Sequence, residues 1–206
     1  MVYDICYWLL RWIFRVFFRL KVIGTENVPR TGPVILASNH VSYLDPLFLG
    51  VSLPRRLNYL AKEELFRTPL SAWFLKKLQA FPVSREKVSA STVRKSFQLV
   101  NQGKALLVFP EGTRGDGKDL LKGKRGIGII AEKSKAAIVP AYLHGPEKIL
   151  PRGSNRLHFH EVSVCFGPPL SSSLASVKWG EEKERGYDEV AERVMSEIAN
   201  LKRRSF

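Results

Sequence analysis

The sequence predicts a single α/β domain with a mostly parallel sheet flanked by helices. Apolar runs of strand length alternate with helical patterns along the chain, and this alternation is typical of consecutive βαβ units. Residues 105–109 are apolar without interruption, as in a strand that helices cover on both faces. The chain has 206 residues, of which 45% are hydrophobic and 25% are charged, so its length and composition suit one domain with one large core.

Residues 1–22 predict an amphipathic helix rather than a membrane-spanning one. Arg11, Arg15 and Arg19 recur every four residues among aromatic and aliphatic side chains, so on a helix they form one stripe. A spanning helix needs about 20 nearly uncharged residues, whereas the longest uncharged run here is residues 5–10. We expect a membrane-interface helix at 1–22 that precedes a folded domain at 23–206. The alternative is a helix packed onto the core.

The rest of the chain divides into short strands and helices. After a turn-rich segment at 24–33, residues 34–38 read as a buried strand. Asp45-Pro46 then begins a helix, because Asp is a good N-cap and Pro suits the first helical turn. Further strands are expected at 57–61, 80–83, 105–109, 137–142 and 162–166. Further helices are expected at 69–77, 89–102, 127–135 and 187–204.

The charge balance predicts an anionic partner. Lys and Arg number 33 against 19 Asp and Glu, which gives a net charge of +14. Such a field attracts phosphates, nucleic acid or an anionic membrane surface. No helix-turn-helix, zinc finger or block of stacking aromatic and basic residues is apparent in the sequence, so we expect no nucleic acid partner. An anionic membrane surface accounts better for basic residues spread along the chain.

The cysteines and histidines predict neither a disulfide framework nor a metal site. Two cysteines, Cys6 and Cys165, are too few for such a framework. The four histidines have no cysteine partners at zinc-finger spacing. His158 and His160 are expected to share one face of a strand, an arrangement that could clamp a metal, but surface histidines are the simpler interpretation. We therefore expect no structural metal.

Two polar clusters directly follow predicted strands. Asn39-His40, with Asp45 close behind, follows the strand at 34–38, and residues 110–114 follow the strand at 105–109. Ligands of open α/β sheets bind outside the carboxyl ends of the strands, so we expect the two clusters to face one crevice. A structural histidine and a helix-capping Asp45 would explain the first cluster equally well.

The two clusters resemble motifs of the glycerolipid acyltransferases. Residues 39–45, NHVSYLD, look like the NHxxxxD motif of that family, and residues 109–114 look like its FPEGTR motif. Three further segments resemble other blocks of the family: residues 62–65 with Pro69, residues 81–83 with Arg85, and Val139-Pro140. The resemblance covers residues 22–145 and points to the 1-acyl-sn-glycerol-3-phosphate acyltransferases.

The resemblance implies an activity and a set of site residues. It implies transfer of a fatty acyl group from acyl-CoA or acyl-carrier protein to the sn-2 hydroxyl of lysophosphatidic acid, which gives phosphatidic acid in phospholipid biosynthesis without a cofactor. His40 is the expected general base, because imidazole titrates near neutral pH, and Asp45 is expected to orient it. The residues expected to bind substrate are Glu111, Gly112, Thr113, Arg114 and Lys124.

The expected contributions of these binding residues differ. Arg114 suits the acceptor phosphate because guanidinium forms paired, charge-assisted hydrogen bonds, and Lys124 is expected to help. Glu111 is expected either to hold its loop or to contact the acceptor. Backbone amides near Glu111 and Gly112 are the expected oxyanion donors.

Other functions remain open from the sequence. Gly112-x4-Gly117-Lys118 mimics the phosphate-binding loop of an NTPase, but Asp119 stands where that motif needs Ser or Thr. A non-catalytic basic membrane-binding protein of the same fold is a second alternative. An acyltransferase of the same family that uses another lyso-lipid acceptor is a third. For the favoured function we expect peripheral or monotopic attachment to the cytoplasmic side of a membrane.

Overall fold

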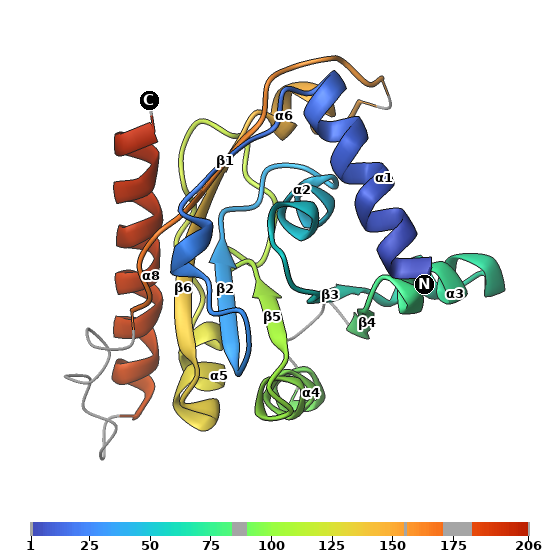
Figure 1. The fold of residues 1–206 in the computed structure, drawn as a ribbon. Coiled ribbons are helices and arrows are strands. Elements are labelled where there is room, and N and C mark those ends of the chain that lie inside the picture. The colour runs from blue at the N-terminus through green and yellow to red at the C-terminus, as the bar shows by residue number, and fades with distance from the viewer. Residues whose placement is uncertain (1, 84–89, 155, 171–182, 206) are drawn as a thin grey trace.

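Helices cover both faces of a central sheet in the computed structural model, which describes residues 2–83, 90–154, 156–170 and 183–205 (Figure 1). Helices α1 (Val2–Phe17) and α2 (Asp45–Ser52) lie on one face. Helices α4 (Ala90–Asn101), α5 (Gly126–Ser134) and α8 (Lys183–Ser205) cover the other. The predicted single α/β unit is confirmed.

The described residues form one seven-stranded sheet in the order β1-β7-β6-β2-β5-β3-β4. The strands are β1 (Lys21–Ile23), β2 (Val34–Ser38), β3 (Leu57–Lys62), β4 (Ala80–Val83), β5 (Ala105–Val108), β6 (Ala137–His144) and β7 (Ser163–Phe166). Neighbours pair in parallel except β6 and β7, which are antiparallel. The sheet is therefore mostly parallel, as the sequence predicts.

The central strand β2 divides the core into two layers, because successive side chains of a strand point to opposite faces. Val34 and Leu36 pack with α1 and α2, whereas Ile35 and Ala37 pack with α4, α5 and α8. All four side chains are fully buried. The residues of β2, which the sequence predicts as a buried strand, thus supply both layers.

Most predicted elements agree with the structure to within a few residues. Helix α3 (Pro69–Lys77) and strands β2 and β4 have the predicted bounds, and α8 begins four residues earlier than predicted. Short turns not expected from the sequence are the 3-10 helices η1 (Thr25–Asn27) and η2 (Glu63–Phe66) and helix α6 (Pro146–Ile149). Arg85, which the family resemblance includes, lies outside the described residues.

The N-terminal helix is shorter than expected. Helix α1 ends at Phe17, and Arg19 takes a left-handed backbone conformation with φ of 44°. The chain then enters the sheet as β1, which pairs in parallel with β7. Pairing with β7 therefore takes up residues that the helical pattern had assigned to the helix.

One side of α1 belongs to the core. Phe14 is only 5% exposed, and its ring stacks on that of Phe48 at a centroid distance of 4.1 Å. The Tyr7 hydroxyl donates to the Leu53 carbonyl at 2.9 Å, and Arg11 Nη1 donates to the Val51 carbonyl at 2.5 Å. These carbonyls lie at the end of α2, where a helix leaves acceptors unpaired and carries partial negative charge. The expected arginine stripe is therefore wrong for Arg11, which turns toward the core.

The opposite side of α1 is apolar and exposed. Its exposed side chains are Ile5, Trp8, Leu9, Trp12 and Val16, with exposed fractions between 54% and 66%. These positions are spaced as one stripe of a helix. Helix α1 thus packs onto the core, as the alternative interpretation of the sequence expects, and it also presents an apolar surface. Its contact with a membrane stays a prediction. No helix among the described residues has the length and hydropathy needed to cross a membrane.

His158 and His160 do not share a strand face, so that expectation is wrong. Strand β7 begins only at Ser163, and residues 156–162 have no regular structure. The backbone of this segment is held elsewhere: the His158 amide donates to the Ile149 carbonyl at 2.8 Å, and the Val162 amide donates to the Phe18 carbonyl at 3.0 Å. Among the described residues, no three His, Cys, Asp or Glu side chains gather as metal ligands would.

The two sides of α1 predict different effects of substitution on stability. Phe14→Ala should lower the free energy of unfolding by about 3–5 kcal/mol, because it leaves a cavity against Phe48. Trp8→Ala should change it by less than about 0.5 kcal/mol, because that side chain lies at the surface. Denaturant unfolding followed by circular dichroism measures both. Equal stability of the two variants would contradict the packing of α1 on the core.

Candidate active site

The two polar clusters meet because β2 and β5 are adjacent and parallel. His40 follows the end of β2 by two residues, and residues 109–114 follow β5 directly. The Gly115 amide donates to the His40 carbonyl at 2.8 Å. The Phe109 and His40 rings stack, with centroids 4.0 Å apart and planes inclined by 14°. Both clusters thus lie at the carboxyl edge of the sheet, which is the place expected for a ligand site in this class of fold.

A buried carboxylate fixes the conformation of the first cluster. Asp45 is fully buried, and its Oδ2 accepts hydrogen bonds from the Val41 amide at 2.6 Å and the Ser42 amide at 2.8 Å. His40 Nδ1 lies 2.7 Å from the same oxygen. An ionised carboxylate can only accept, so Nδ1 carries the proton and donates to Asp45. This pairing leaves Nε2 as the basic nitrogen of a neutral imidazole.

Asp45 does not cap helix α2, which corrects the sequence-based expectation. The N-cap residue is Leu44, and no side chain caps this helix end. Asp45 is the first helical residue, and side chains of a helix point back toward its N-terminus. The carboxylate therefore reaches the loop before the helix instead of the helical amides that follow.

Burial and hydrogen bonding act on Asp45 in opposite directions. Burial raises the pKa of the Asp45 carboxyl, and hydrogen bonds from His40, Ser42 and Val41 oppose that rise. Its second oxygen, Oδ1, is also buried and has no hydrogen-bond partner among the described residues. All the polar contacts therefore converge on Oδ2, the oxygen that faces the imidazole.

Glu111 joins three segments of the site. Glu111 is only 2% exposed. Its Oε1 accepts from the His40 amide at 2.9 Å, and its Oε2 accepts from the Leu121 amide at 3.0 Å. Burial raises the pKa of the Glu111 carboxyl, and these two backbone hydrogen bonds oppose the rise. Of the two expected roles, this geometry matches the one in which Glu111 holds its loop.

Asn39 ties the same loop to the neighbouring strand β6. Its Oδ1 accepts from the Leu143 amide at 2.8 Å, and its Nδ2 donates to the Leu143 carbonyl at 2.9 Å. The side chain thereby takes the place of a strand partner just where β2 ends. The sequence identifies Asn39 only as a member of a motif. An amide side chain directly after a strand can, however, bond both a backbone N–H and a backbone carbonyl.

Arg114 lies against an aromatic ring from the first cluster. Its guanidinium carbon is 3.5 Å from the centroid of the Tyr43 ring, and its backbone carbonyl accepts from Arg152 Nη1 at 3.3 Å. Stacking on an aromatic face stabilises a guanidinium while its edge donors remain directed outward. Thr113, beside it, is exposed. No sequence pattern indicates the contribution of Tyr43, because this residue occupies a variable position of the NHxxxxD motif.

Gly112 allows the Lys124 side chain to lie against the loop. Its φ of 67° is left-handed, and a Cβ at this position would lie 2.9 Å from Lys124 Cδ. The Lys124 amide also donates to the Pro110 carbonyl at 2.8 Å. The Gly112 amide itself donates to the Phe109 carbonyl at 3.0 Å. The role of backbone amides near Glu111 and Gly112 as oxyanion donors stays a prediction.

An apolar cavity of about 260 Å³ borders the first cluster. The lining residues that belong to the NHxxxxD motif or directly follow it are Tyr43, Pro46 and Leu47. Other lining residues include Cys6, Tyr7 and Leu10 of α1, Gly50 and Val51 of α2, Tyr59, Leu60 and Ala61 of β3, and Phe74, Leu75 and Leu78 of the α3 region. The cavity can accept an apolar chain beside a polar reaction centre.

Comparison with known proteins gives consistent similarities. The acyltransferase family model matches residues 19–144. A 1-acyl-sn-glycerol-3-phosphate acyltransferase of Bacillus subtilis is 31% identical over 200 residues, which are 97% of this chain and 98% of that protein. A chloroplastic 1-acyl-sn-glycerol-3-phosphate acyltransferase of Arabidopsis thaliana is 30% identical over 82% of this chain and 48% of that longer protein.

A solved structure shows the same similarity in three dimensions. The crystal structure of the 1-acyl-sn-glycerophosphate (LPA) acyltransferase from Thermotoga maritima superposes with a TM-score of 0.74 and 26% sequence identity, and covers 98% of this chain and 80% of that chain. The matched region of the family model contains both clusters that the sheet brings together. The resemblance inferred from the two motifs is thereby confirmed, and this chain belongs to the acyltransferase family.

Proposed function

We propose that this protein transfers a fatty acyl group from a thioester to the sn-2 hydroxyl of 1-acyl-glycerol-3-phosphate and so forms phosphatidic acid for phospholipid synthesis. The observation that carries the proposal is the pairing of His40 with buried Asp45 next to a loop that presents Arg114. The pair suits activation of a hydroxyl, and the loop suits a phosphate. The named activity of the relatives from Bacillus subtilis, Arabidopsis thaliana and Thermotoga maritima supports this acceptor.

His40 acts as the base in this mechanism. Asp45 holds one proton on Nδ1, so Nε2 is free to accept another. It takes the proton of the acceptor hydroxyl while the hydroxyl oxygen attacks the thioester carbonyl. Collapse of the tetrahedral intermediate breaks the carbon–sulfur bond, and the imidazolium gives its proton to the departing thiolate, which leaves as the thiol. Asp45 stabilises the imidazolium between these two steps. The thioester is already activated, so neither step uses a cofactor.

Phe109 and Asp45 together restrict the orientation of the imidazole. The Phe109 ring covers one face of His40, while the hydrogen bond to Asp45 fixes rotation within the ring plane. A base held in one orientation loses little conformational freedom when the acceptor binds, which lowers the barrier to reaction. We expect Nε2 to be directed consistently at the acceptor hydroxyl.

The acceptor phosphate is assigned to the loop that follows β5. Arg114 presents its guanidinium on the Tyr43 ring, and Lys124 lies across Gly112. Charge-assisted hydrogen bonds from such groups are about twice as strong as neutral ones. Glu111 contributes indirectly, because it holds this loop to the His40 backbone.

Acyl chains and the membrane are assigned to the apolar surfaces. The cavity beside Tyr43 suits a fatty acyl chain, because apolar side chains surround it and it adjoins the reaction centre. The exposed stripe of α1, with Trp8 and Trp12, suits a helix that lies in the plane of a bilayer. Both acyl-CoA and acyl-carrier protein present the required thioester, so we propose either as the donor.

The proposed reaction is tested with purified protein, both donors and a panel of lyso-lipids. Phosphatidic acid should form from 1-acyl-glycerol-3-phosphate, and His40→Ala should lower kcat by at least about 100-fold, because general-base assistance is typically worth 10²–10⁴. A thermal melt of the variant controls for folding. Faster turnover of another lyso-lipid would assign a different acceptor, and near-normal turnover of His40→Ala would remove this residue from the mechanism.

Arg114→Ala should act on the acceptor and not on the donor. The loss of a hydrogen bond to a charged group is worth about 1.5–3 kcal/mol, which corresponds to a rise of about 10- to 100-fold in the KM for the acceptor. Steady-state kinetics with each substrate varied in turn gives both KM values. Arg193→Ala, on helix α8 where this side chain pairs with Glu189 of the same helix, should leave both unchanged. A higher donor KM with an unchanged acceptor KM would place Arg114 at the donor site.

Glu111→Gln separates positioning from contact with substrate. A carboxamide has only one acceptor oxygen, so its NH₂ group would face the amide of either His40 or Leu121 and loosen the loop. We expect kcat to fall at least about 10-fold, since a lost charged hydrogen bond is worth about 1.5–3 kcal/mol, with little change in the acceptor KM. Glu189→Gln, on the surface of α8, is the matched control. A change confined to the acceptor KM would indicate direct contact with the acceptor.

A further inference from the structure

Other segments continue the exposed apolar stripe of α1 at both of its ends. We propose that the protein contacts an anionic lipid bilayer through a composite face, which consists of α1, α3 and residues 156–160. The apolar side chains of this composite face are Trp8, Trp12, Leu70, Trp73, Leu157 and Phe159. The inference rests on the proposed function, because an acceptor embedded in a membrane requires the active site to work at a bilayer surface.

Residues 156–160 extend the stripe beyond the last turn of α1. The Phe159 ring lies 6.0 Å from that of Phe17 and 5.7 Å from that of Phe18. Even so, Phe159 is 76% exposed and Leu157 is 66% exposed. Packing against α1 therefore places these side chains at the end of the helix without removing them from solvent.

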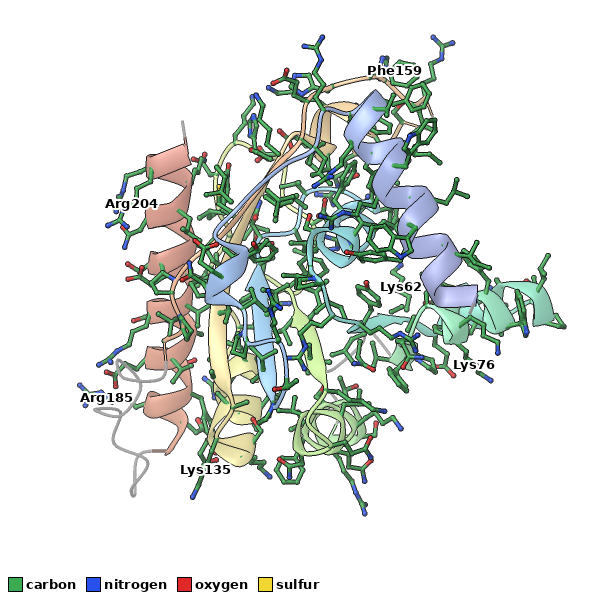
Figure 2. The ribbon with its side chains drawn as sticks, viewed as in Figure 1. Lys62, Lys76, Lys135, Phe159, Arg185 and Arg204 are labelled. Atoms are coloured by element: carbon green, nitrogen blue, oxygen red, sulfur yellow. The ribbon has the colours of Figure 1, made fainter. Side chains whose placement is uncertain are left out.

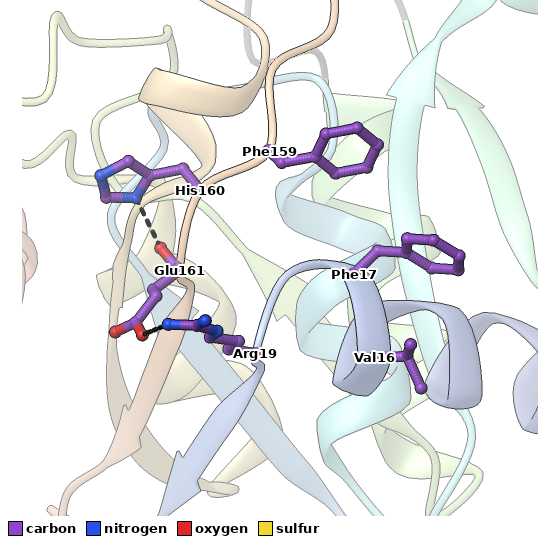
Figure 3. A pocket seen from close by; sticks show the side chains of 6 residues that line it. All are labelled: Val16, Phe17, Arg19, Phe159, His160 and Glu161. Carbon is purple, nitrogen blue, oxygen red and sulfur yellow. Dashed lines mark hydrogen bonds and ion pairs between the residues drawn. The ribbon is translucent and has the colours of Figure 1, made fainter.

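The junction between α1 and this segment contains an open cleft of about 590 Å³ with two unlike sides. Figure 3 shows Phe17 and Phe159 on one side and Arg19, His160 and Glu161 on the other. Arg19 Nη1 donates to Glu161 Oε1 at 3.1 Å, yet the Arg19 side chain remains 76% exposed. An apolar side next to an exposed cation is the lining expected at the level of lipid headgroups.

Helix α3 extends the stripe at the other end of α1. Figure 1 shows α3 beside the N-terminal end of α1, and Cys6 and Phe74 line the same apolar cavity. Leu70 is 76% exposed and Trp73 is 51% exposed. Figure 2 shows Phe159 near one end of α1 and Lys76 of α3 near the other, so the three segments follow one another along the molecule.

Basic side chains accompany the apolar ones in each segment, which favours a lipid surface over a protein partner. Arg15 lies near the end of α1, Arg156 adjoins Leu157, and Lys76 with Lys77 end α3. The acidic residue in the cleft, Glu161, is already paired with Arg19 and with Lys21. Aromatic side chains bordered by cations are typical of proteins that bind the interface of anionic bilayers.

The segment that contains Leu157 and Phe159 also reaches the active site. Arg152, shortly before it, donates to the carbonyl of Arg114, which is the proposed phosphate ligand. The His158 amide is bonded to the end of α6 at Ile149, and the Leu150 carbonyl next to it accepts from the Ser42 hydroxyl at 3.4 Å. Contact of this segment with the bilayer would therefore orient the acceptor site toward the membrane.

Vesicle flotation of charge-insertion variants tests the composite face. The probe is liposomes of phosphatidylcholine with phosphatidylglycerol, and the variants are Leu157→Glu/Phe159→Glu, Leu157→Glu alone and Leu70→Glu/Trp73→Glu. Each double variant should lower the partition coefficient at least about 10-fold, because two apolar side chains leave the interface and two charges enter it. Ile23→Glu is the control, since Ile23 is 60% exposed on edge strand β1. It should float like the unchanged protein.

Turnover of a short-chain, water-soluble lysophosphatidic acid separates this inference from the proposed function. All variants should retain that turnover within about two-fold of the unchanged protein, because the substituted residues lie outside the site. If neither the unchanged protein nor any variant turned over this substrate, while the variants still floated less well, the proposed acceptor would be overturned and the composite face would stand. Equal flotation of the unchanged protein and the Leu157 variants would limit the bilayer contact to α1 and overturn the inference.

Two further measurements complete the test. Thermal melts identify any variant that has lost its fold, and Leu157→Glu alone then decides the result because Phe159 keeps its contacts with α1. Light scattering of the unchanged protein over a range of concentrations measures self-association. A dimer that the same variants dissociate, without flotation of the unchanged protein, would assign the face to a second copy of the chain and overturn the bilayer assignment.

Discussion

The hydrogen bonds to buried Asp45 are the constraint on which the rest of the site depends. A carboxylate removed from water is costly unless nearby donors replace the lost solvent, and here three consecutive residues, 40–42, supply them. Meeting this requirement bends the loop, fixes the His40 tautomer and sets the position of the His40 backbone. Glu111 then accepts from that backbone, so the second loop is built on the first.

The same requirement operates at the ends of β2 and α2. Asn39 supplies a donor and an acceptor to Leu143 beyond the end of β2. Tyr7 and Arg11 supply donors to carbonyls at the end of α2. In each case a side chain satisfies backbone groups that regular structure leaves unpaired. The elements around the site are therefore held together by polar contacts at their ends as well as by the apolar core between them.

The sequence predicts those features that depend on nearby residues. Strand β2 and helix α3 have the predicted bounds, because a covered strand and a helix that begins at Thr68-Pro69 both carry local signals. The end of α1 was predicted wrongly because the pairing of β1 with β7 joins segments about 140 residues apart, which local periodicity does not register. The stacking of Arg114 on Tyr43 and the hydrogen bond from the His40 amide to Glu111 also depend on how distant segments meet. The motifs identify the candidate reacting groups, and the folded chain determines which side chains and backbone groups hold them in place.

Under the proposed function, helix α1 would link membrane binding to folding, because its two sides belong to one rigid element. Its inner side fills the core with Phe14 and pairs the end of α2 through Arg11, so a chain without this helix would lose internal packing as well as the proposed membrane contact. A ligand that binds only the folded form stabilises that form by mass action. Under the proposed function a bilayer is such a ligand, and vesicles should raise the melting temperature of the whole domain. The lipid surface then acts as an external component of the fold.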